Sequence, residues 1–267
     1  MNLKIKNLIK KILPKNLLKW IKKYISFFHT QDTISKNYQI LKNPNLIKLR
    51  AKYNDAWKDS SIPQKQLKLS KKEMPNFINV VPMRALINLL KKFDTNGKNL
   101  LEIGCSNGYY SEVLKKAGFN INYEGCDYSE KFIKLAKKRY PTINFKISNA
   151  TKLDYNDNQF DIVISGCCIL HIVDYALAIK ETVRVAKKNV IFHRTPMIHK
   201  NKTVFTTKTG YDVEMLEILF NEEELIDLFN KNGLVVKNIN SHSAFSVKDL
   251  DEPVFMKSYL CQKMTKR

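Results

Sequence analysis

The chain has 267 residues, of which 44% are hydrophobic and 10% aromatic, and this composition excludes an intrinsically disordered protein. It can bury a full hydrophobic core, and it contains no run of about 18 uncharged apolar residues that would cross a bilayer. The formal net charge is +21, but 40 of the basic residues are Lys and only six are Arg, so the charge alone does not indicate specific nucleic-acid recognition.

The first predicted element is a basic amphipathic helix over residues 1–30. Apolar side chains recur at helical spacing, and residues 1–28 contain eight Lys and no acidic residue. Pro14 is expected to kink this helix. The pattern predicts an in-plane contact with an anionic membrane surface, and it is equally consistent with a helix that packs on its own domain or on a second subunit.

Residues 31–78 are polar and are interrupted by Pro44, Pro63 and Pro75. This pattern predicts an extension of short helices and loops, which is a candidate for a lid. Residues 53–58 and 62–66 within it are candidates for one wall of a cleft. Residues 1–78 together contain 18 Lys and Arg against four Asp and Glu, so an anionic partner, if there is one, meets this end of the chain.

From residue 79 to residue 267, short apolar runs alternate with helical patterns, which is typical of βαβ units. Strands are predicted near residues 99–103, 121–126, 143–147, 160–165, 188–193, 234–239 and 256–262. A helix is predicted over residues 222–231, with Asn221 as its cap. The predicted fold is α/β, a Rossmann-like doubly wound and mostly parallel seven-stranded sheet with helices on both faces, plus the N-terminal helical extension.

A glycine-containing loop follows the first of these strands. Gly104 and Gly108 lack side chains, so the backbone there can approach a ligand at the start of a helix. The spacing is Gly-x-Ser-x-Gly with Ser106 in the middle, and it differs from the Gly-x-Gly-x-x-Gly of dinucleotide-binding folds. Asp127 ends the second strand, where a carboxylate can accept both hydroxyls of a ribose.

These segments resemble the successive motifs of class I S-adenosylmethionine-dependent methyltransferases, and the resemblance covers residues 79–267. It implies S-adenosylmethionine as cofactor, the methionine moiety near Gly104, the ribose on Asp127 and the adenine amino group on Asn149. Ser106 and Asn149 depart from the glycine and aspartate that are common in the family. The implied cofactor-binding residues are Glu102, Gly104, Cys105, Ser106, Gly108, Asp127, Tyr128, Asn149, Ala150 and Ser165.

Two histidines are the candidate catalytic residues. His171 follows the fourth strand and is the first candidate for a base that takes a proton from an acceptor hydroxyl, because imidazole titrates near neutrality. His193 leaves the fifth strand toward the same rim. The alternative for His171 is that it only packs at the start of a helix.

Arg194, Tyr211 and Trp57 are the candidate acceptor-binding residues. Arg194 could hold an anionic group, or it could be a solvated side chain. Tyr211 lies in the stretch after the fifth strand, where residues 197–220 make a long connector, and long loops are often binding loops. Trp57 could instead be a core residue.

Five cysteines, Cys105, Cys126, Cys167, Cys168 and Cys261, form no Cys-x-x-Cys pair. We expect reduced thiols, no metal site and a cytoplasmic protein, peripheral to the inner membrane face if the first helix binds lipid. The basic first helix and the polar loop over residues 197–217 favour O-methylation of a small molecule or of a sugar on a lipid-linked or surface glycan, and the chain resembles methyltransferases of bacterial surface-polysaccharide pathways.

Two alternatives stay open. One is methylation of RNA or protein, although no specific nucleic-acid motif is present. The other is a membrane-associated adaptor that keeps the fold without the reaction. The sequence does not indicate an oligomeric state.

Overall fold

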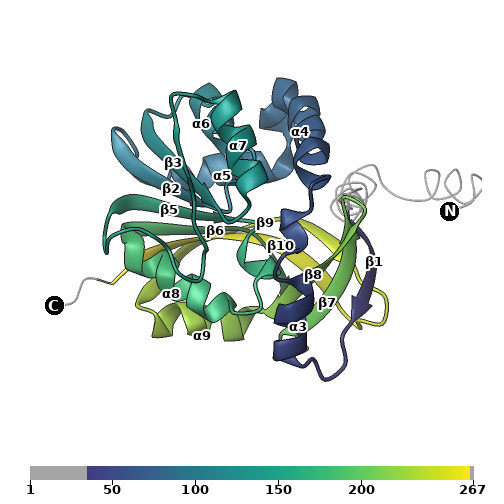
Figure 1. Cartoon of the computed structure of the whole chain (residues 1–267). Coiled ribbons are helices and arrows are strands. Elements are labelled where there is room, and N and C mark those ends of the chain that lie inside the picture. The colour runs from purple at the N-terminus through teal and green to yellow at the C-terminus, as the bar shows by residue number, and fades with distance from the viewer. Residues whose placement is uncertain (1–34, 265–267) are drawn as a thin grey trace, which may run out of the picture.

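The computed structural model describes residues 35–264, and the helix predicted over residues 1–30 lies outside this range. At its centre, seven strands lie in the order β4, β3, β2, β5, β6, β10, β9 (Figure 1). The first five are parallel, whereas β10 runs antiparallel to β6 and β9. In the same order, they span Asn144–Ile147, Ile121–Asp127, Lys98–Ile103, Phe160–Gly166, Ala186–Ile198, Pro253–Lys263 and Leu234–Ser246. The predicted α/β doubly wound class is confirmed.

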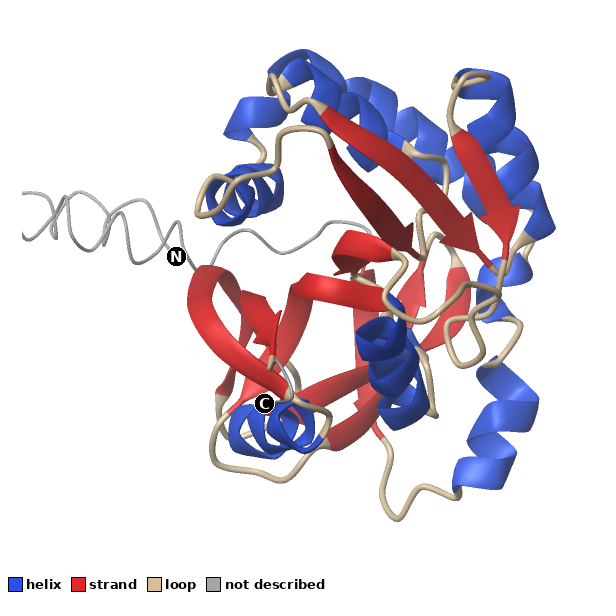
Figure 2. Ribbon diagram, turned by 90° about the vertical axis from the view of Figure 1, so that its left-hand side faces the viewer, coloured by secondary structure: helices blue, strands red, loops and turns tan. Residues whose placement is uncertain are grey.

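Helices cover both faces of this sheet, because successive residues of a strand point to opposite faces (Figures 1 and 2). Leu100 and Ile162 pack in the cluster that contains α5 and α6, while Leu101 and Val163 pack in the cluster that contains α8 and α9. The remaining helix, α7, packs beside β3 and β4. The five helices span Val81–Leu90 (α5), Tyr109–Lys116 (α6), Glu130–Arg139 (α7), Tyr175–Val185 (α8) and Glu222–Lys231 (α9).

Helix α9 shows how the local sequence sets an element's ends. The side chain of Asn221 accepts a hydrogen bond from the backbone N–H of Glu224 at 3.1 Å, and three acidic residues occupy the first turn. A cap of this kind stabilises a helix by about 1 kcal/mol, and the acidic side chains complement the helix dipole. The predicted helix and its cap are confirmed.

Three further strands were not predicted, so the mixed sheet has ten strands instead of seven. They are β1 (Ser35–Ile40), β7 (Val204–Gly210) and β8 (Val213–Asn221), which pair antiparallel in the order β1, β7, β8. The end of β6 joins them, since Met197 and Ile198 pair with the end of β8. The prediction of a loop over residues 197–220 was therefore wrong. Thr and Lys dominate β7, so it lacks the apolar run by which the other strands were found.

The N-terminal extension contains the predicted helices in addition to β1. It includes α3 (Leu46–Tyr53) and α4 (Ile62–Glu73), with 3₁₀ turns at Ala56–Lys58 (η1) and Met74–Asn79 (η2). Pro63 stands in the first turn of α4, where a missing N–H costs nothing. Within residues 35–264, no helix is both long and apolar enough to cross a membrane.

A buried carboxylate fixes the connection between β6 and β7. Glu252 accepts hydrogen bonds from the backbone N–H groups of His199, Lys200 and Asn201 at 2.6 to 3.0 Å. Burial alone would raise its pKa, but these hydrogen bonds outweigh burial and lower the pKa of Glu252 to about 2. The ionised form therefore stabilises the fold.

We expect Glu252→Gln to lower the free energy of unfolding by about 1 to 3 kcal/mol at pH 7, since it removes the charge and replaces one accepting oxygen by an NH2 group that cannot accept. The carboxylate's contribution is complete above the unfolded-state pKa near 4.5 and is lost as the pH falls toward about 2. Urea denaturation at pH 7 and pH 3 measures this, and an equal difference between wild type and variant at both values would contradict it.

Candidate functional site

The loop after β2 is held tightly against its neighbouring strands. Gly104 has a φ of +73°, and a Cβ at this position would lie 2.9 Å from Sγ of Cys168. The N–H groups of Gly104 and Cys105 both donate to the carbonyl oxygen of Cys126, at 2.8 and 2.9 Å. A residue with a side chain at position 104 would strain the backbone and push the loop away from the segment after β5.

Ser106 stands at the middle of this loop in a left-handed conformation, with a φ of +53°. Such a conformation favours glycine, the residue common at this position in the family that the sequence resembles. Its N–H donates to Oδ2 of Asp127 at 3.0 Å, and its hydroxyl donates to Oε1 of Gln66 on α4. The serine hydroxyl therefore links the loop to the N-terminal extension, which glycine could not do.

Asp127 ends β3 and is 8% exposed. Its second carboxylate oxygen accepts a hydrogen bond from the N–H of Ser129 at 2.9 Å, so the carboxylate connects two loops. Burial raises the pKa of Asp127 to about 6, although the backbone hydrogen bonds from Ser129, Ser106 and Tyr128 act in the opposite direction. The carboxylate is ionised at neutral pH and is close to titration.

A second carboxyl group lies at the end of β2. Glu102 is buried and accepts a hydrogen bond from the hydroxyl of Tyr123. Burial raises the pKa of Glu102 well above its ordinary value. Two acidic side chains from adjacent strands therefore stand at the same edge of the sheet, where open α/β sheets bind ligands.

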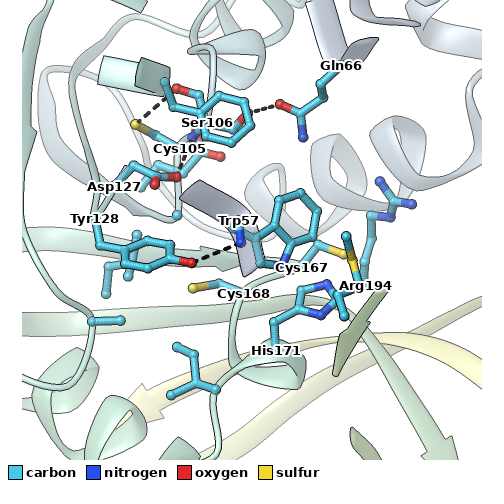
Figure 3. A pocket seen from close by; sticks show the side chains of 18 of the residues that line it. Trp57, Gln66, Cys105, Ser106, Asp127, Tyr128, Cys167, Cys168, His171 and Arg194 are labelled. Carbon is cyan, nitrogen blue, oxygen red and sulfur yellow. Dashed lines mark hydrogen bonds between the residues drawn. The ribbon is translucent and has the colours of Figure 1, made fainter. Parts of the chain in front are cut away.

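These residues line a cavity of about 230 Å³ (Figure 3). The carboxyl ends of β2, β3 and β5 form one side of it, and the N-terminal extension forms the other. Two predicted cofactor residues stand outside its lining: Gly108, which caps the start of α6, and Ser165, which is buried in β5. The predicted cofactor residues that line it are Glu102, Gly104, Cys105, Ser106, Asp127, Tyr128, Asn149 and Ala150.

Asn149 lines the cavity but already uses its side-chain oxygen. That oxygen accepts from the backbone N–H of Thr151 at 3.0 Å and from its hydroxyl at 2.9 Å. The predicted bond from an adenine amino group would have to share this oxygen. An amide nitrogen with two donor hydrogens remains the other group that Asn149 offers to a base.

Helix α4 lies across the glycine loop. The side-chain amide of Asn107 donates to Gln66 at 3.2 Å and to Ser70 at 3.1 Å. Earlier in the extension, on α3, the guanidinium of Arg50 donates to both carboxylate oxygens of Asp174 at 2.7 and 2.5 Å. The sequence placed residues 62–66 beside the cleft, but it gave no signal for the pairing of Arg50 with Asp174, which lie 124 residues apart.

Trp57 stands between the two sides of the cavity (Figure 3). Its backbone N–H donates to the hydroxyl of Tyr128 at 3.2 Å. Its ring centroid lies 4.8 Å from that of His171 and 6.0 Å from that of Tyr211. The indole N–H is buried and has no hydrogen-bond partner among residues 35–264. Trp57 and Tyr211, both predicted to bind the acceptor, therefore line the cavity together.

His171 lines the cavity from a short 3₁₀ turn, Ile169–His171 (η3). Its Nδ1 lies 2.6 Å from the carbonyl oxygen of Leu216 on β8, so Nδ1 carries the proton and Nε2 keeps its lone pair. Burial, followed by the nearby Lys208 ammonium, lowers the pKa of His171 to about 4. The imidazole is thus neutral at pH 7.

His193 is fully buried and does not line the cavity. Strand β6 continues to Ile198, so His193 lies inside the strand, whereas the sequence predicted that it leaves the strand's end. Its Nδ1 lies 2.8 Å from Oγ of Ser258 on β10, which is also 3.1 Å from Nε2 of His242. Burial lowers the pKa of His193 well below its ordinary value and that of His242 to about 3, so both imidazoles are neutral.

Arg194 does line the cavity, as expected for a residue that binds the acceptor. Its φ is +58°, an uncommon value for a residue with a side chain. The backbone N–H of Arg194 donates to Oγ of Ser258 at 3.2 Å. The buried polar cluster around Ser258 therefore supports the strained backbone that carries Arg194.

A buried ion pair borders the cavity through Lys208, and no signal in the sequence predicted it. Lys208 on β7 pairs with Glu217 on β8, and they are 8% and 2% exposed. Lys208 also donates to Ser35 at 3.0 Å, and the hydroxyl of Tyr38 donates to Glu217 at 2.9 Å. Burial alone would raise the pKa of Glu217, but Lys208, His171 and the hydroxyl of Tyr38 together outweigh burial and lower the pKa.

Comparison with known proteins places residues 101–193 in a family model described as a methyltransferase domain. The chain is 31% identical over 115 residues to the phthiotriol/phenolphthiotriol dimycocerosates methyltransferase of Mycobacterium tuberculosis, covering 41% of this chain and 40% of that protein. It is 29% identical over 182 residues to the ubiquinone biosynthesis O-methyltransferase of Pelagibacter ubique, covering 61% and 74%. The chain thus spans less than half the length of the mycobacterial relative.

Solved structures share the fold at low sequence identity. The 1,6-didemethyltoxoflavin-N1-methyltransferase of Burkholderia thailandensis, solved with 1,6-didemethyltoxoflavin and S-adenosylhomocysteine, has a TM-score of 0.58 and 12% identity over 89% of this chain and 99% of that chain. An S-adenosylmethionine-dependent methyltransferase of Clostridium acetobutylicum has a TM-score of 0.55 and 14% identity over 75% and 98%. At such identities the likeness concerns the fold alone.

We expect Glu217→Gln to lower the free energy of unfolding by about 3 to 5 kcal/mol, because it leaves the Lys208 ammonium buried without a counter-charge. The double variant Lys208→Met/Glu217→Leu should recover most of this loss. Urea denaturation measures both, with Glu130→Gln, in the exposed Lys134–Glu130 pair at the start of α7, as a control that costs at most about 1 kcal/mol. A loss no larger for Glu217→Gln than for the control would contradict the expectation.

Proposed function

Since the chain belongs to the class I S-adenosylmethionine-dependent methyltransferases, we propose that it transfers a methyl group from S-adenosylmethionine to an oxygen atom of a small-molecule or lipid-linked acceptor. The observation that carries the proposal is one cavity with two chemically different halves. One half holds two carboxyl groups and a glycine loop at the ends of β2 and β3, and the other half holds the neutral imidazole of His171, two aromatic rings and an arginine.

The residues of the first half fit an adenosyl sulfonium cofactor. The Asp127 carboxylate borders the cavity, and its two oxygens have four lone pairs for three backbone N–H donors, so acceptor capacity remains for a ribose hydroxyl. Glu102 offers a second acidic group for the methionine ammonium. Gly104 borders the cavity through its backbone, and we assign Ala150 and Asn149, which also line the cavity, to the base.

When bound, the cofactor supplies a methyl group activated by positively charged sulfur. The protein's part is to align the acceptor with that methyl group and to exclude water, and alignment of this kind can contribute several kcal/mol to catalysis. Helix α4 and Trp57 close the cavity from the side of the N-terminal extension through contacts with Ser106 and Tyr128. We assign Trp57, Tyr211 and Arg194 to the acceptor.

His171 is the proposed base. Nε2 of His171 would take the hydroxyl proton of the acceptor as that oxygen becomes methylated. A pKa of about 4 suffices, because an oxygen that carries both a methyl group and a proton is a far stronger acid than an imidazolium. The bond from Nδ1 to Leu216 fixes the ring in the required tautomer.

The choice of oxygen as acceptor atom rests on this neutral base and on the Pelagibacter relative, whose name includes O-methyltransferase. The choice of a small or lipid-linked acceptor, for which we favour a sugar of a surface glycan, rests on the enclosed cavity and on the basic residues 1–28. The two relatives described above are named for dimycocerosates and for ubiquinone biosynthesis, which supports a small-molecule or lipid acceptor.

We expect the affinity for S-adenosylhomocysteine to fall as the pH falls through about 6, because a protonated Asp127 loses an acceptor site for the ribose. Asp127→Asn should bind about 10- to 100-fold more weakly at pH 7.5, as expected when a hydrogen bond to a charged group is lost. It should also lose the pH dependence. Calorimetric titration between pH 5 and 8 measures both.

A urea denaturation curve for Asp127→Asn separates weak binding from misfolding. The pH dependence of the wild-type protein tests the same assignment without any substitution. A wild-type affinity that stays constant from pH 5 to pH 8 would remove Asp127 from the ribose site.

We expect His171→Asn to lower the turnover number by about 10²- to 10⁴-fold while S-adenosylhomocysteine binds normally, since the amide can still donate to Leu216 but cannot take a proton. The assay is transfer of labelled methyl groups into a cell extract, fractionated into lipid, glycan, RNA and protein. His199→Asn, which changes an exposed histidine outside the cavity, is the matched control.

The same fractionation tests the acceptor class. Label in the lipid or glycan fraction supports the proposal, whereas label confined to RNA or protein overturns the assignment of the acceptor. Full turnover by His171→Asn would show that another group removes the proton.

A further inference from the structure

A second hollow opens beside the cavity, and we call it the lysine groove. It is lined by Lys36, Lys65, Lys68, Leu69, Lys72, Tyr211 and Asp212. Four of these seven side chains are cationic and one is anionic. No motif of the methyltransferase fold accounts for this concentration of positive charge.

The lysines converge from two directions. Lys65, Lys68 and Lys72 are spaced three and four residues apart on α4, so they share one face of the helix. Lys36 comes from β1, and Asp212 comes from the turn between β7 and β8, whose tip lies beside α4 (Figure 1).

The single carboxylate of the groove does not neutralise it. Asp212 lies 3.9 Å from Lys36 and 3.2 Å from Lys65. Within the described residues, Lys68 and Lys72 have no acidic partner. Inside the cavity the opposite holds, since Lys208 is paired with Glu217 and Arg50 with Asp174. The uncompensated charge of this region is therefore located in the groove.

The groove is continuous with the cavity, because Leu69 and Tyr211 line both. Tyr211 and Asp212 form a two-residue hairpin turn with φ values of +54° and +64°, at positions where Asn and Gly are the usual residues. Lys65 holds this turn by donating to the carbonyl oxygen of Tyr211 at 2.6 Å. Backbone strain of this kind concentrates at ligand-binding sites, and here it places an aromatic ring where the groove joins the cavity.

We propose that the lysine groove binds a phosphate or diphosphate group of the acceptor, while the part to be methylated passes Tyr211 into the cavity. This inference rests on the proposed function and names its substrate class, a phosphorylated acceptor. Flexible ammonium groups around an open hollow match the several charged oxygens of a diphosphate, whereas the paired ions of the cavity suit an uncharged reacting end.

The test is calorimetric titration of the full chain with sodium pyrophosphate at low ionic strength. The variant Lys68→Gln/Lys72→Gln removes the two lysines that lack an acidic partner. We expect it to bind pyrophosphate at least tenfold more weakly than the wild-type protein, and the wild-type affinity should fall steeply with added salt.

Lys91→Gln/Lys92→Gln is the matched control, because it removes the same charge from two adjacent exposed lysines at the end of α5. It should bind pyrophosphate as the wild-type protein does. Equal affinity in the wild-type protein and the groove variant overturns the proposal, and so does an equal loss in both variants, which would show a dependence on net charge alone.

One further measurement distinguishes a phosphorylated acceptor from a membrane surface as the ligand of the groove. Another distinguishes a failure of the groove proposal from a failure of the proposed function. If the groove variant loses binding to phosphatidylglycerol vesicles but not to pyrophosphate, the groove serves a membrane surface and the proposal is wrong. S-adenosylhomocysteine should bind the groove variant normally. A wild-type protein that binds pyrophosphate through the groove but not S-adenosylhomocysteine would refute the proposed function and keep the groove, and the reverse result would refute only the groove.

Discussion

The site depends on the hydrogen bonds that two backbone N–H groups donate to the carboxylate of Asp127. One N–H belongs to Ser106 in the loop after β2, and the other belongs to Ser129 at the start of α7. The carboxylate therefore sets the distance between two loops that border the cavity from adjacent strands. Its burial is costly, which is visible in its raised pKa, and the fold accepts this cost at the edge where a ligand would share the same oxygens.

Backbone strain gathers around the same cavity. The described chain contains nine residues other than glycine with positive φ, and four of them, Ser106, Cys167, Arg194 and Tyr211, line the cavity. Each is held by a hydrogen bond to another part of the chain: Ser106 by Gln66 of α4, Cys167 by the carbonyl oxygen of His193, Arg194 by Ser258, and Tyr211 by Lys65. Strained residues persist only where the surroundings fix them in this way, so the site is stabilised by contacts that lie outside it.

The half of the site that belongs to the parallel sheet was predictable from the sequence. Apolar strands, the glycine loop and Asp127 carry local signals, and these signals agree with one another. The acceptor half was not predictable to the same degree, because its signals exist only after folding. Lys208 and Glu217 each look like a solvated residue until β7 and β8 pair, and the hairpin turn has Tyr and Asp where Asn and Gly would have announced it.

The long strand β6 connects the parallel sheet with the hairpin of β7 and β8. Its first part pairs with β5 inside the parallel sheet, and its last two residues pair with β8 of the hairpin. In the strand pairing, the hairpin and β1 are therefore joined to the parallel sheet through these two residues only, while the apolar side chains of β8 pack into the same core as α8 and α9. Substitutions in the hairpin can reshape the acceptor wall while the loops around Asp127 stay in place. Evolution, or an engineer, could exchange one acceptor for another by rebuilding residues 199–220 and 35–40 on an unchanged methyl-transfer scaffold.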